Sequence, residues 1–225
     1  MITVHHLENS RSQRILWLLE ELNLTYEIKV YQRDPKTLFA PPELKAVHPL
    51  GKSPVITDNG RVIAESAVII DYLVNKYGNG KLKPHDEENL LRYTYWLHYA
   101  EGSAMTPFLM KLVFDKIETS PMPFFVRPIA KKISGAVKSS WIHPQIKLHL
   151  EYLEGELGKT GWFAGNDFSA ADIMMSYPIE AANARGGLGG KNLECFHQKI
   201  TSRPAYLRAI ERGGPFSVIP VSSKR

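Results

Sequence analysis

The first part of the chain alternates two kinds of hydrophobic spacing. Residues 2–7 and 25–31 alternate apolar with other side chains, as half-buried strands do. Between them, apolar residues recur every three or four positions, which predicts an amphipathic helix over Ser10–Leu22. Ser10 with Gln13 fits a capping box, so Ser10 is expected to begin that helix.

A second group of elements follows a long polar loop at residues 32–52, which holds one short predicted helix near residues 43–47. The segments Pro54–Thr57 and Arg61–Ala64 flank the turn Asp58-Asn59-Gly60 and predict a β-hairpin. A helix is expected from Glu65 to Tyr77. The predicted order is therefore βαβ, a connecting loop and then ββα.

The pattern becomes helical throughout after Tyr77. Residues 79–86 form a polar, glycine-bearing linker, and Ser169 with Asp172 forms a capping box before an apolar run. Further helices are expected at 87–117 with a kink at Pro107, and at 124–138, 145–157, 192–200 and 204–212. The tail, residues 217–225, is expected to attach loosely. The chain thus divides into an α/β domain, residues 1–78, and an all-helical domain, residues 87–225.

Composition narrows the class of protein. Of 225 residues, 44% are hydrophobic and 23% charged, as in ordinary globular proteins, and the net charge is +5 without a basic cluster that would indicate nucleic-acid binding. The sequence contains no apolar run of about 18 residues, so no membrane span is predicted, and the N-terminus does not resemble a signal peptide. The single cysteine, Cys195, suits a cytoplasmic location and is expected to be buried and inert.

Two interpretations of Ser10 remain open from this stretch alone. The hydroxyl either only caps the helix or also faces a bound ligand. Two arginines, Arg11 and Arg14, accompany it. Arg14 is expected to be structural, whereas Arg11 could reach solvent or ligand.

Three motifs in order resemble the cytosolic glutathione transferases, and the resemblance covers nearly the whole chain. They are Ser10-Arg11-Ser12-Gln13-Arg14, Ser53-Pro54-Val55 followed by Glu65-Ser66, and Phe168-Ser169-Ala170-Ala171-Asp172. The serine-type members common in bacteria and fungi are the most similar. The resemblance implies a thioredoxin-like N-terminal domain that binds glutathione, a helical domain that contributes the electrophile pocket, and a homodimer that packs the α/β domain of one chain against the helical domain of the other.

The resemblance also implies roles for individual residues. Ser10 would donate a hydrogen bond to the glutathione sulfur and stabilise the thiolate, with Ser12 as its nearest rival and Asn9 as a possible aid. Glutathione would be held by a cis Pro54 with the backbone of Val55, by Glu65 and Ser66 at a helix N-terminus, and by Lys52 and Arg11. The tyrosine-type and cysteine-type mechanisms fit poorly, because the first tyrosine is Tyr26 and no cysteine precedes Cys195.

The electrophile pocket is expected between the domains, lined by Gly102, Ser103, Thr106 and Met110. Simple helix packing explains each of these residues almost equally well. No metal is expected, because His5 and His6 lie on the first strand and are expected to pack or to form local hydrogen bonds. The leading hypothesis is glutathione conjugation to an electrophile. The alternatives are a glutathione-dependent peroxidase or disulfide reductase on the same site, and a non-catalytic interaction module of the same fold.

Overall fold

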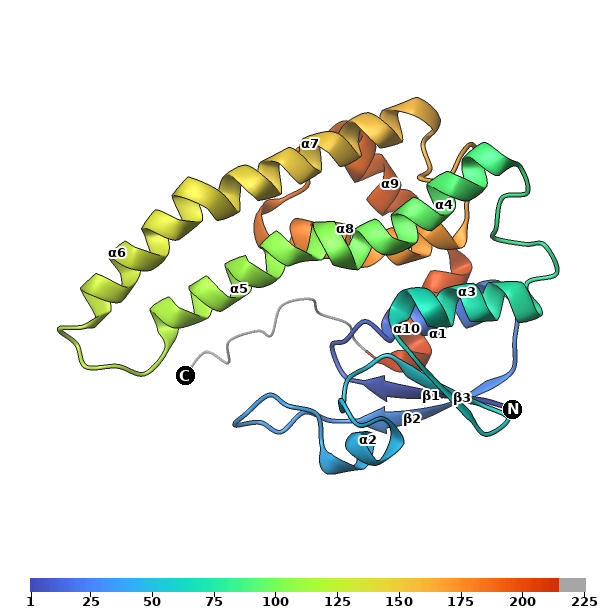
Figure 1. Cartoon of the computed structure of the whole chain (residues 1–225), viewed down its shortest axis with the longest axis horizontal. Helices are drawn as coiled ribbons and strands as arrows, with labels where there is room; N and C mark the ends of the chain where they lie inside the picture. The colour runs from blue at the N-terminus through green and yellow to red at the C-terminus, as the bar shows by residue number, and fades with distance from the viewer. Residues whose placement is uncertain (215–225) are drawn as a thin grey trace.

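The N-terminal domain is a four-stranded sheet with helices, as predicted. The computed structural model describes residues 1–214 (Figure 1). The elements of the N-terminal domain are β1 (Ile2–Leu7), α1 (Gln13–Glu21), β2 (Tyr26–Tyr31), α2 (Pro42–Val47), β3 (Val55–Asp58), β4 (Arg61–Ala64) and α3 (Ser66–Tyr77). The strand order is β2-β1-β3-β4; β1 is parallel to β2, and the other two pairs are antiparallel. The predicted βαβ–ββα order is confirmed.

Helices follow in the second half of the chain. They are α4 (Glu87–Tyr99), the π-helix η1 (Ala100–Ala104), α5 (Met105–Thr119), α6 (Arg127–Val137), the π-helix η2 (Lys138–Ile142), α7 (His143–Thr160), α8 (Ala170–Gly186), α9 (Lys191–Thr201) and α10 (Pro204–Gly213). In Figure 1 they lie against one side of the sheet domain. None of the helices within residues 1–214 combines the length and apolar character needed to cross a membrane.

The two domains share one hydrophobic core. On β1, Ile2 and Val4 are buried on the same face as His6. Helix α1 is buried along most of its length and packs between the sheet and helices α8 and α10. Both sides of α1 are therefore covered, which fixes the helical domain against the loop that precedes α1.

The predicted capping box at Ser169 and Asp172 is confirmed. The Asp172 carboxylate accepts hydrogen bonds from the backbone N–H groups of Ser169 and Phe163, each at 2.8 Å. Helix α8 then runs through the core, with residues from Ala170 to Ala182 buried. The box starts this central helix at a defined residue, and α8 in turn presents Met174 and Tyr177 behind the site described below.

The long predicted helices differ from the structure in their interruptions. The segment expected as one helix over 87–117, kinked at Pro107, consists of α4, η1 and α5, and η1 breaks the α-helical pattern before Pro107. The helix expected at 124–138 begins at Arg127, where Pro128 occupies the first turn. It continues through η2 into α7, which the sequence indicated as a separate helix. The tail at 217–225 lies outside the described residues.

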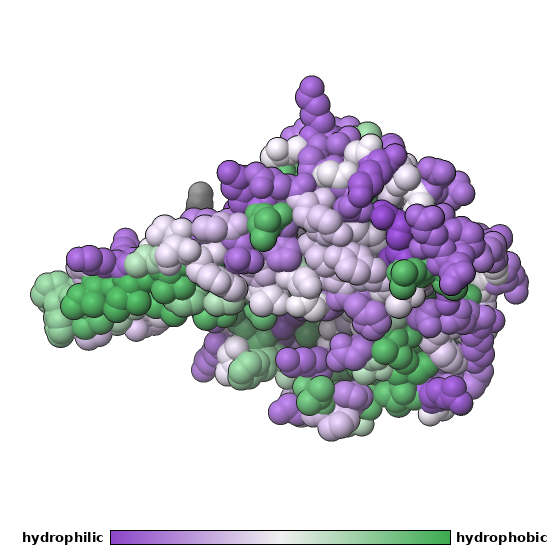
Figure 2. Space-filling view, turned by 45° about the horizontal axis from the view of Figure 1, so that its top comes forward, coloured by the Kyte–Doolittle hydropathy of each residue, from purple (hydrophilic) through white to green (hydrophobic). Residues whose placement is uncertain are grey.

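Helices α5 and α6 form an arm that projects from the body of the molecule (Figure 1). Figure 2 shows apolar side chains gathered on the arm's tip, at the left of the view. The exposed apolar residues of the arm are Leu109, Val113, Ile117, Phe124, Phe125, Ile129 and Ile133.

Cys195, expected to be buried, is exposed on α9. That prediction is wrong because Leu193 and Phe196, not Cys195, form the buried face of that helix.

Asp58 attaches α3 to the sheet. Its Oδ2 accepts hydrogen bonds of 2.7 Å from the Tyr72 and Tyr77 hydroxyls and from the Lys76 ammonium, all three on α3. Burial alone would raise the pKa of Asp58, but these three bonds outweigh it and lower the pKa to about 2. Asp58 therefore holds the helix whose N-terminus contributes to the site.

We predict that Asp58→Asn destabilises the protein at neutral pH by about 1–3 kcal/mol, because a charged acceptor of three bonds is replaced. The carboxylate's contribution is present above its unfolded pKa of about 3.9 and is lost as the pH falls toward the folded value. The difference in unfolding free energy between wild type and variant should therefore shrink between about pH 5 and pH 2. Urea unfolding at a series of pH values measures it.

Asp71→Asn is the matched control. Asp71 also lies on α3, but its carboxylate is half-exposed and pairs with Lys83 at 3.0 Å. Its replacement should cost less than about 1 kcal/mol. Wild-type and Asp58→Asn curves that stay parallel with pH would show that Asp58 does not carry the acid dependence.

Candidate active site

Ser10 lies before α1 rather than at its start. The helix begins at Gln13, with Ser12 as the N-cap residue, so the predicted start at Ser10 is wrong. Residues 10–12 instead form tight turns, in which the Gln13 and Arg14 N–H groups donate to the carbonyls of Ser10 and Arg11. The predicted capping box is also absent. The Gln13 amide is buried without a hydrogen-bond partner among the described residues, and the Ser10 hydroxyl bonds to other serines.

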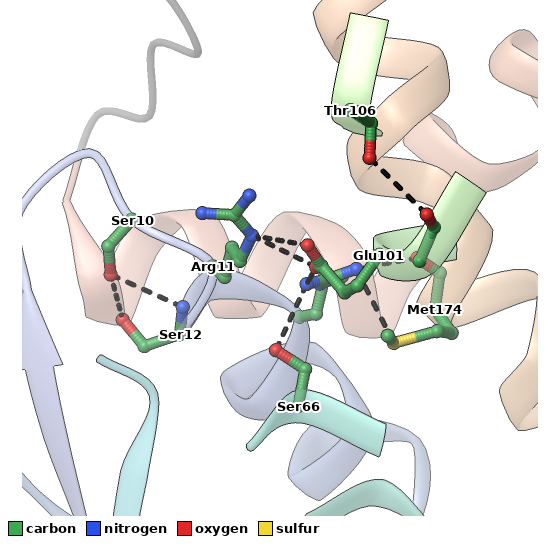
Figure 3. Close-up of polar contacts among 9 residues, drawn as sticks. Ser10, Arg11, Ser12, Ser66, Glu101, Thr106 and Met174 are labelled. Carbon is green, nitrogen blue, oxygen red and sulfur yellow. Dashed lines mark hydrogen bonds and ion pairs between the residues drawn. The ribbon is translucent and has the colours of Figure 1, made fainter. Parts of the chain in front are cut away.

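Three serine hydroxyls meet at the end of β1. Ser10 Oγ lies 2.8 Å from Ser12 Oγ and 3.2 Å from Ser53 Oγ, and it accepts a 3.3 Å hydrogen bond from the Ser12 N–H. Figure 3 shows the contact between Ser10 and Ser12. Ser53 donates to the His5 carbonyl at 3.0 Å. Ser10 and Ser12 are both buried, so their hydroxyls depend on one another and on the neighbouring backbone for hydrogen bonds.

The buried ring of His6 terminates this chain of hydroxyls. Its Nδ1 lies 2.8 Å from Ser12 Oγ. Burial lowers the pKa of His6, and a hydrogen bond with the Gly213 backbone acts in the opposite direction, as a carbonyl does when it accepts from a ring N–H. The ring is therefore neutral at pH 7, with its proton on the nitrogen that faces Gly213. Nδ1 is then an acceptor, and Ser12 donates to it. This confirms the expectation of local hydrogen bonding for His6.

Two arginines share one carboxylate beside the serines. Arg11 Nε lies 2.9 Å from both Glu101 oxygens, and Arg14 contacts the same carboxylate at 2.5 Å (Figure 3). Arg14 is fully buried and also donates to the Met174 carbonyl and to Ser66 Oγ. Burial alone would raise the pKa of Glu101, but Arg14 and Arg11 outweigh it and lower the pKa below its usual range. Arg14 is structural, as predicted.

The segment around Pro54 lies next to the serine cluster. The Ser53–Pro54 peptide bond is cis, as the resemblance implied. Val55 is buried and pairs with His5 of β1 and with Ala64 of β4, so it has strand neighbours on both sides. Ser53 precedes the strand and lies outside this ladder. Lys52 is exposed at the surface beside it.

The N-terminus of α3 approaches the same region. Glu65 is its N-cap residue and has a φ of 72°, an uncommon conformation for a residue other than glycine. Its side chain is exposed. Ser66 is buried, and its hydroxyl accepts the 3.0 Å hydrogen bond from Arg14. The helix N-terminus, with its unpaired N–H groups, is thus tied to Arg14 and through it to Glu101.

Two of the four residues predicted for the electrophile pocket line one described hollow. Gly102 and Ser103 line a hollow between α4 and α7 together with Tyr99 and His149. Thr106 is exposed, and its hydroxyl donates to the Gly102 carbonyl at 3.3 Å (Figure 3). Met110 lies one turn further along α5 and is partly buried.

Sequence reasoning missed Ser53 and Glu101 as site residues, and also Tyr177. The Tyr177 ring lies 5.0 Å from the guanidinium carbons of both Arg11 and Arg14. Glu101 immediately precedes the predicted pocket residue Gly102, which was the available signal. Its inward position depends on η1, and no sequence pattern indicated that π-helix.

Comparisons with known proteins agree with this arrangement. Residues 10–76 match the family model described as the glutathione S-transferase N-terminal domain. The chain is 40% identical to Glutathione S-transferase 3 of Schizosaccharomyces pombe over 217 residues, which cover 94% of this chain and 88% of that protein. It is 35% identical to Glutathione S-transferase 1 of Saccharomyces cerevisiae, with 94% and 95% of the two chains covered.

A solved structure extends the agreement to the fold. A glutathione S-transferase from Actinobacillus pleuropneumoniae superposes with a TM-score of 0.77 at 32% identity, covering 97% of this chain and 95% of that one. Both domains take part, since almost the whole of each chain is covered. The chain belongs to the glutathione S-transferase family and is a glutathione transferase enzyme.

Proposed function

We propose that this enzyme activates glutathione through the hydroxyl of Ser10, which donates a hydrogen bond to the glutathione sulfur and stabilises it as a thiolate. The thiolate then attacks an electrophilic carbon. Only the ionised form of a thiol is a good nucleophile, and a free thiol with a pKa of about 8.5 is mostly protonated at pH 7. A shift of about two pKa units requires about 2.7 kcal/mol of differential stabilisation, which one directed hydrogen bond and the nearby N-terminus of α1 can share.

The observation that carries the proposal is the set of contacts around the three serine hydroxyls, from which we infer which proton each one donates. A serine hydroxyl has one proton to donate. Ser12 gives its proton to His6 Nδ1, and Ser53 gives its proton to the His5 carbonyl. Among residues 1–214, these two hydroxyls are the hydrogen-bond acceptors of Ser10, so its proton can turn to an incoming sulfur without leaving a backbone carbonyl or ring nitrogen of that part of the chain unsatisfied. This supports Ser10 over Ser12 as the donor.

Glutathione is an extended tripeptide, and we propose that it binds along Ser66 and Glu65, then the backbone beside Pro54, and then Lys52. Ser66 and the N-terminus of α3 would hold the γ-glutamyl carboxylate, because Ser66 accepts from Arg14 and so keeps its own proton for a ligand. Glu65 would pair with the ammonium group. The backbone beside Pro54 would bind the cysteinyl part. Val55 already has strand neighbours on both sides, so the backbone of Ser53 fits this role better than the backbone of Val55. Lys52 would pair with the glycyl carboxylate.

We predict that Ser10→Ala raises the pKa of the bound glutathione thiol by about two units and lowers kcat/KM at pH 7 by about 20-fold or more. Glutathione affinity should stay within a few-fold, because the carboxylate contacts remain. The ultraviolet absorbance of the thiolate, followed against pH in the binary complex, measures the pKa.

Ser12→Ala is the matched control, because it removes a neighbouring buried hydroxyl from the same turn. It should leave the thiol pKa within a few tenths of a unit and cost stability of about 1 kcal/mol through the lost bond to His6. A large pKa rise in Ser12→Ala, with none in Ser10→Ala, would reverse the assignment.

Ser66→Ala tests the γ-glutamyl position. We predict about tenfold weaker glutathione binding by calorimetry, equivalent to about 1.4 kcal/mol for one lost hydrogen bond to a charged group. Ser176→Ala removes another buried hydroxyl, one that bonds within α8 to the Ile173 carbonyl, and should not change the affinity. Equal affinities for wild type and Ser66→Ala would place the γ-glutamyl end elsewhere.

We further propose a homodimer formed through the exposed face of α4 and α7. Apolar and aromatic side chains, Leu91, Tyr95, Leu148 and Tyr152, are exposed there, and the Tyr152 hydroxyl donates to that of Tyr95 across the two helices at 3.2 Å. Two hollows, one between α3 and α4 and one between α4 and α7, share Thr94 and His98. The face therefore continues from the helical domain to the α/β domain, as an interface between both domains requires.

Light scattering should give the mass of a dimer for the wild type and a shift toward half that mass for Leu148→Asp, since a charge would be buried at an apolar contact. Leu207→Asp changes an equally exposed leucine on α10 and should remain dimeric. A monomeric wild type at micromolar concentration, or an unchanged Leu148→Asp dimer, would contradict this interface.

The exposed free thiol of Cys195 supports a reducing compartment, and we propose the cytoplasm.

A further inference from the structure

The outer end of the arm formed by α5 and α6 carries large, exposed apolar side chains. Phe124 is 87% exposed and Phe125 is 65% exposed, and their ring centroids lie 5.6 Å apart in an edge-to-face contact. Ile129 and Ile133, four residues apart on one side of α6, are 59% and 60% exposed. We call these four residues the arm tip. Figure 2 shows apolar side chains at the end of the arm, projecting beyond the body of the molecule.

The packing of α6 on α5 does not use the arm tip. Ser134 is the one buried residue of α6, and its hydroxyl donates a 3.1 Å hydrogen bond to the Phe114 carbonyl of α5. The two isoleucines of the arm tip remain exposed beside this contact. Large apolar side chains gathered in water are unfavourable, and such a patch on a protein surface marks a site of contact with a partner or a membrane.

The arm also holds most of the excess positive charge of the chain. Residues 105–142 contain six basic and two acidic residues, a net charge of +4, in a chain whose net charge is +5. Asp115 pairs with Lys111 at 2.6 Å and with Lys138 at 2.8 Å, and Glu118 pairs with the same Lys138. The other four basic residues of the arm are exposed and have no ion-pair partner within residues 1–214; they are Lys116, Arg127, Lys131 and Lys132.

The hairpin of the arm gathers these four cations around the arm tip. Lys116 lies in the last turn of α5 and Arg127 begins α6, on either side of the loop that carries the two phenylalanines. Lys131 follows Arg127 by four residues, so the two lie on the same side of α6, away from the isoleucines. An apolar end surrounded by cations fits the interface of an anionic lipid bilayer, where apolar side chains enter the acyl boundary and Lys and Arg stay among the headgroups.

The shape of the arm favours a bilayer over two other partners. The arm projects as a convex end (Figure 1), whereas a protein helix is usually received in an apolar groove. A nucleic-acid duplex would contact the cations through its phosphates and leave the arm tip in water. The proposed dimer face lies on α4 and α7, so a second copy bound there leaves the arm tip exposed (Figure 1).

We propose that the enzyme is a peripheral membrane protein, which binds anionic bilayers by inserting the arm tip into their interfacial region. Phe124 and Phe125 enter the acyl boundary, and the four surrounding cations contact the headgroups. The cytoplasmic leaflet of a membrane supplies a negatively charged surface of this kind. No residue of the proposed glutathione site takes part, so membrane binding and thiolate formation are separate properties of the chain.

Co-sedimentation of the full chain with lipid vesicles tests the proposal. Vesicles of phosphatidylcholine with about one-third phosphatidylserine should bind the wild type at least about tenfold more tightly than phosphatidylcholine alone, since each Lys or Arg near an anionic surface contributes about fivefold. Binding should weaken as the salt concentration rises, because salt screens the attraction to the headgroups.

Two variants separate the apolar and the charged contributions. Phe124→Asp should weaken binding to the anionic vesicles by at least about tenfold, because it removes an inserted ring and adds a charge that the surface repels. Lys131→Glu combined with Lys132→Glu should have an effect of similar size with the phenylalanines in place. All three positions are exposed, so the urea unfolding transition and the glutathione affinity by calorimetry should match wild type.

The matched controls make the same changes elsewhere on the surface. Leu207→Asp adds a charge at an exposed leucine of α10. Lys81→Glu combined with Lys191→Glu changes the net charge equally, at exposed positions in the linker before α4 and at the start of α9. Both controls should bind the anionic vesicles within about twofold of wild type, since charges far from the bilayer are screened.

Several outcomes would overturn the inference. They are a wild type that does not bind anionic vesicles, equal binding to both kinds of vesicle, and binding that Phe124→Asp retains in full. If light scattering showed an oligomer that Phe124→Asp disrupts, without vesicle binding by the wild type, the arm tip would be a contact between copies of the chain. Binding to a DNA duplex in place of vesicles, unchanged in Phe124→Asp, would assign the cations to nucleic acid.

Discussion

The buried guanidinium of Arg14 is the interaction on which the arrangement of the site depends. A charge removed from water is tolerated only when hydrogen-bonded partners surround it. The partners come from three other elements: Ser66 at the start of α3, Glu101 in η1, and the Met174 carbonyl in α8. Because Arg14 itself lies on α1, one side chain links α1 and α3 of the sheet domain to η1 and α8 of the helical domain.

The parts of this fold that the sequence predicted are those determined by local pattern. The alternation in β1, the hairpin turn at Asn59-Gly60 and the capping box at Ser169 and Asp172 all result from interactions over a few residues. The motif resemblance then brought together segments distant in sequence. Ser10, Pro54 and Ser66 could be named as one group for that reason, although no periodicity relates them.

Tertiary contacts explain what the sequence did not reveal. Ser10 and Gln13 have the spacing of a capping box, but the Ser10 hydroxyl bonds to Ser12 and Ser53 instead, and the helix begins at Gln13. Glu101 became a site residue only because a π-helix turns it toward α1. Cys195 was assigned to the wrong side of α9, since a residue next to a buried phenylalanine in sequence points in another direction on a helix.

The three serine hydroxyls show how neighbouring contacts can decide which hydroxyl donates its proton to a ligand. Three serines within hydrogen-bond distance are chemically alike, and their own contacts do not tell them apart. The ring of His6 and the backbone carbonyl of His5, from adjacent residues of β1, accept from Ser12 and Ser53 and so remove two of the three protons from competition. The contacts with β1 thus distinguish the Ser10 hydroxyl from the other two, and the backbone N–H of Ser12 polarises the Ser10 hydroxyl by donating a hydrogen bond to it.

The π-helix at Ala100–Ala104 also determines the rotational phase of the helix that follows it. An α-helix turns by about 100° per residue, so one residue more or fewer in that segment would rotate every side chain of α5 about the helix axis by roughly that angle. A change of chain length by one residue would then turn a different set of side chains toward the neighbouring helices, with no substitution along α5 itself. In this family member, insertion or deletion at a single turn would change one whole helix face at once, which point mutation would need several steps to match.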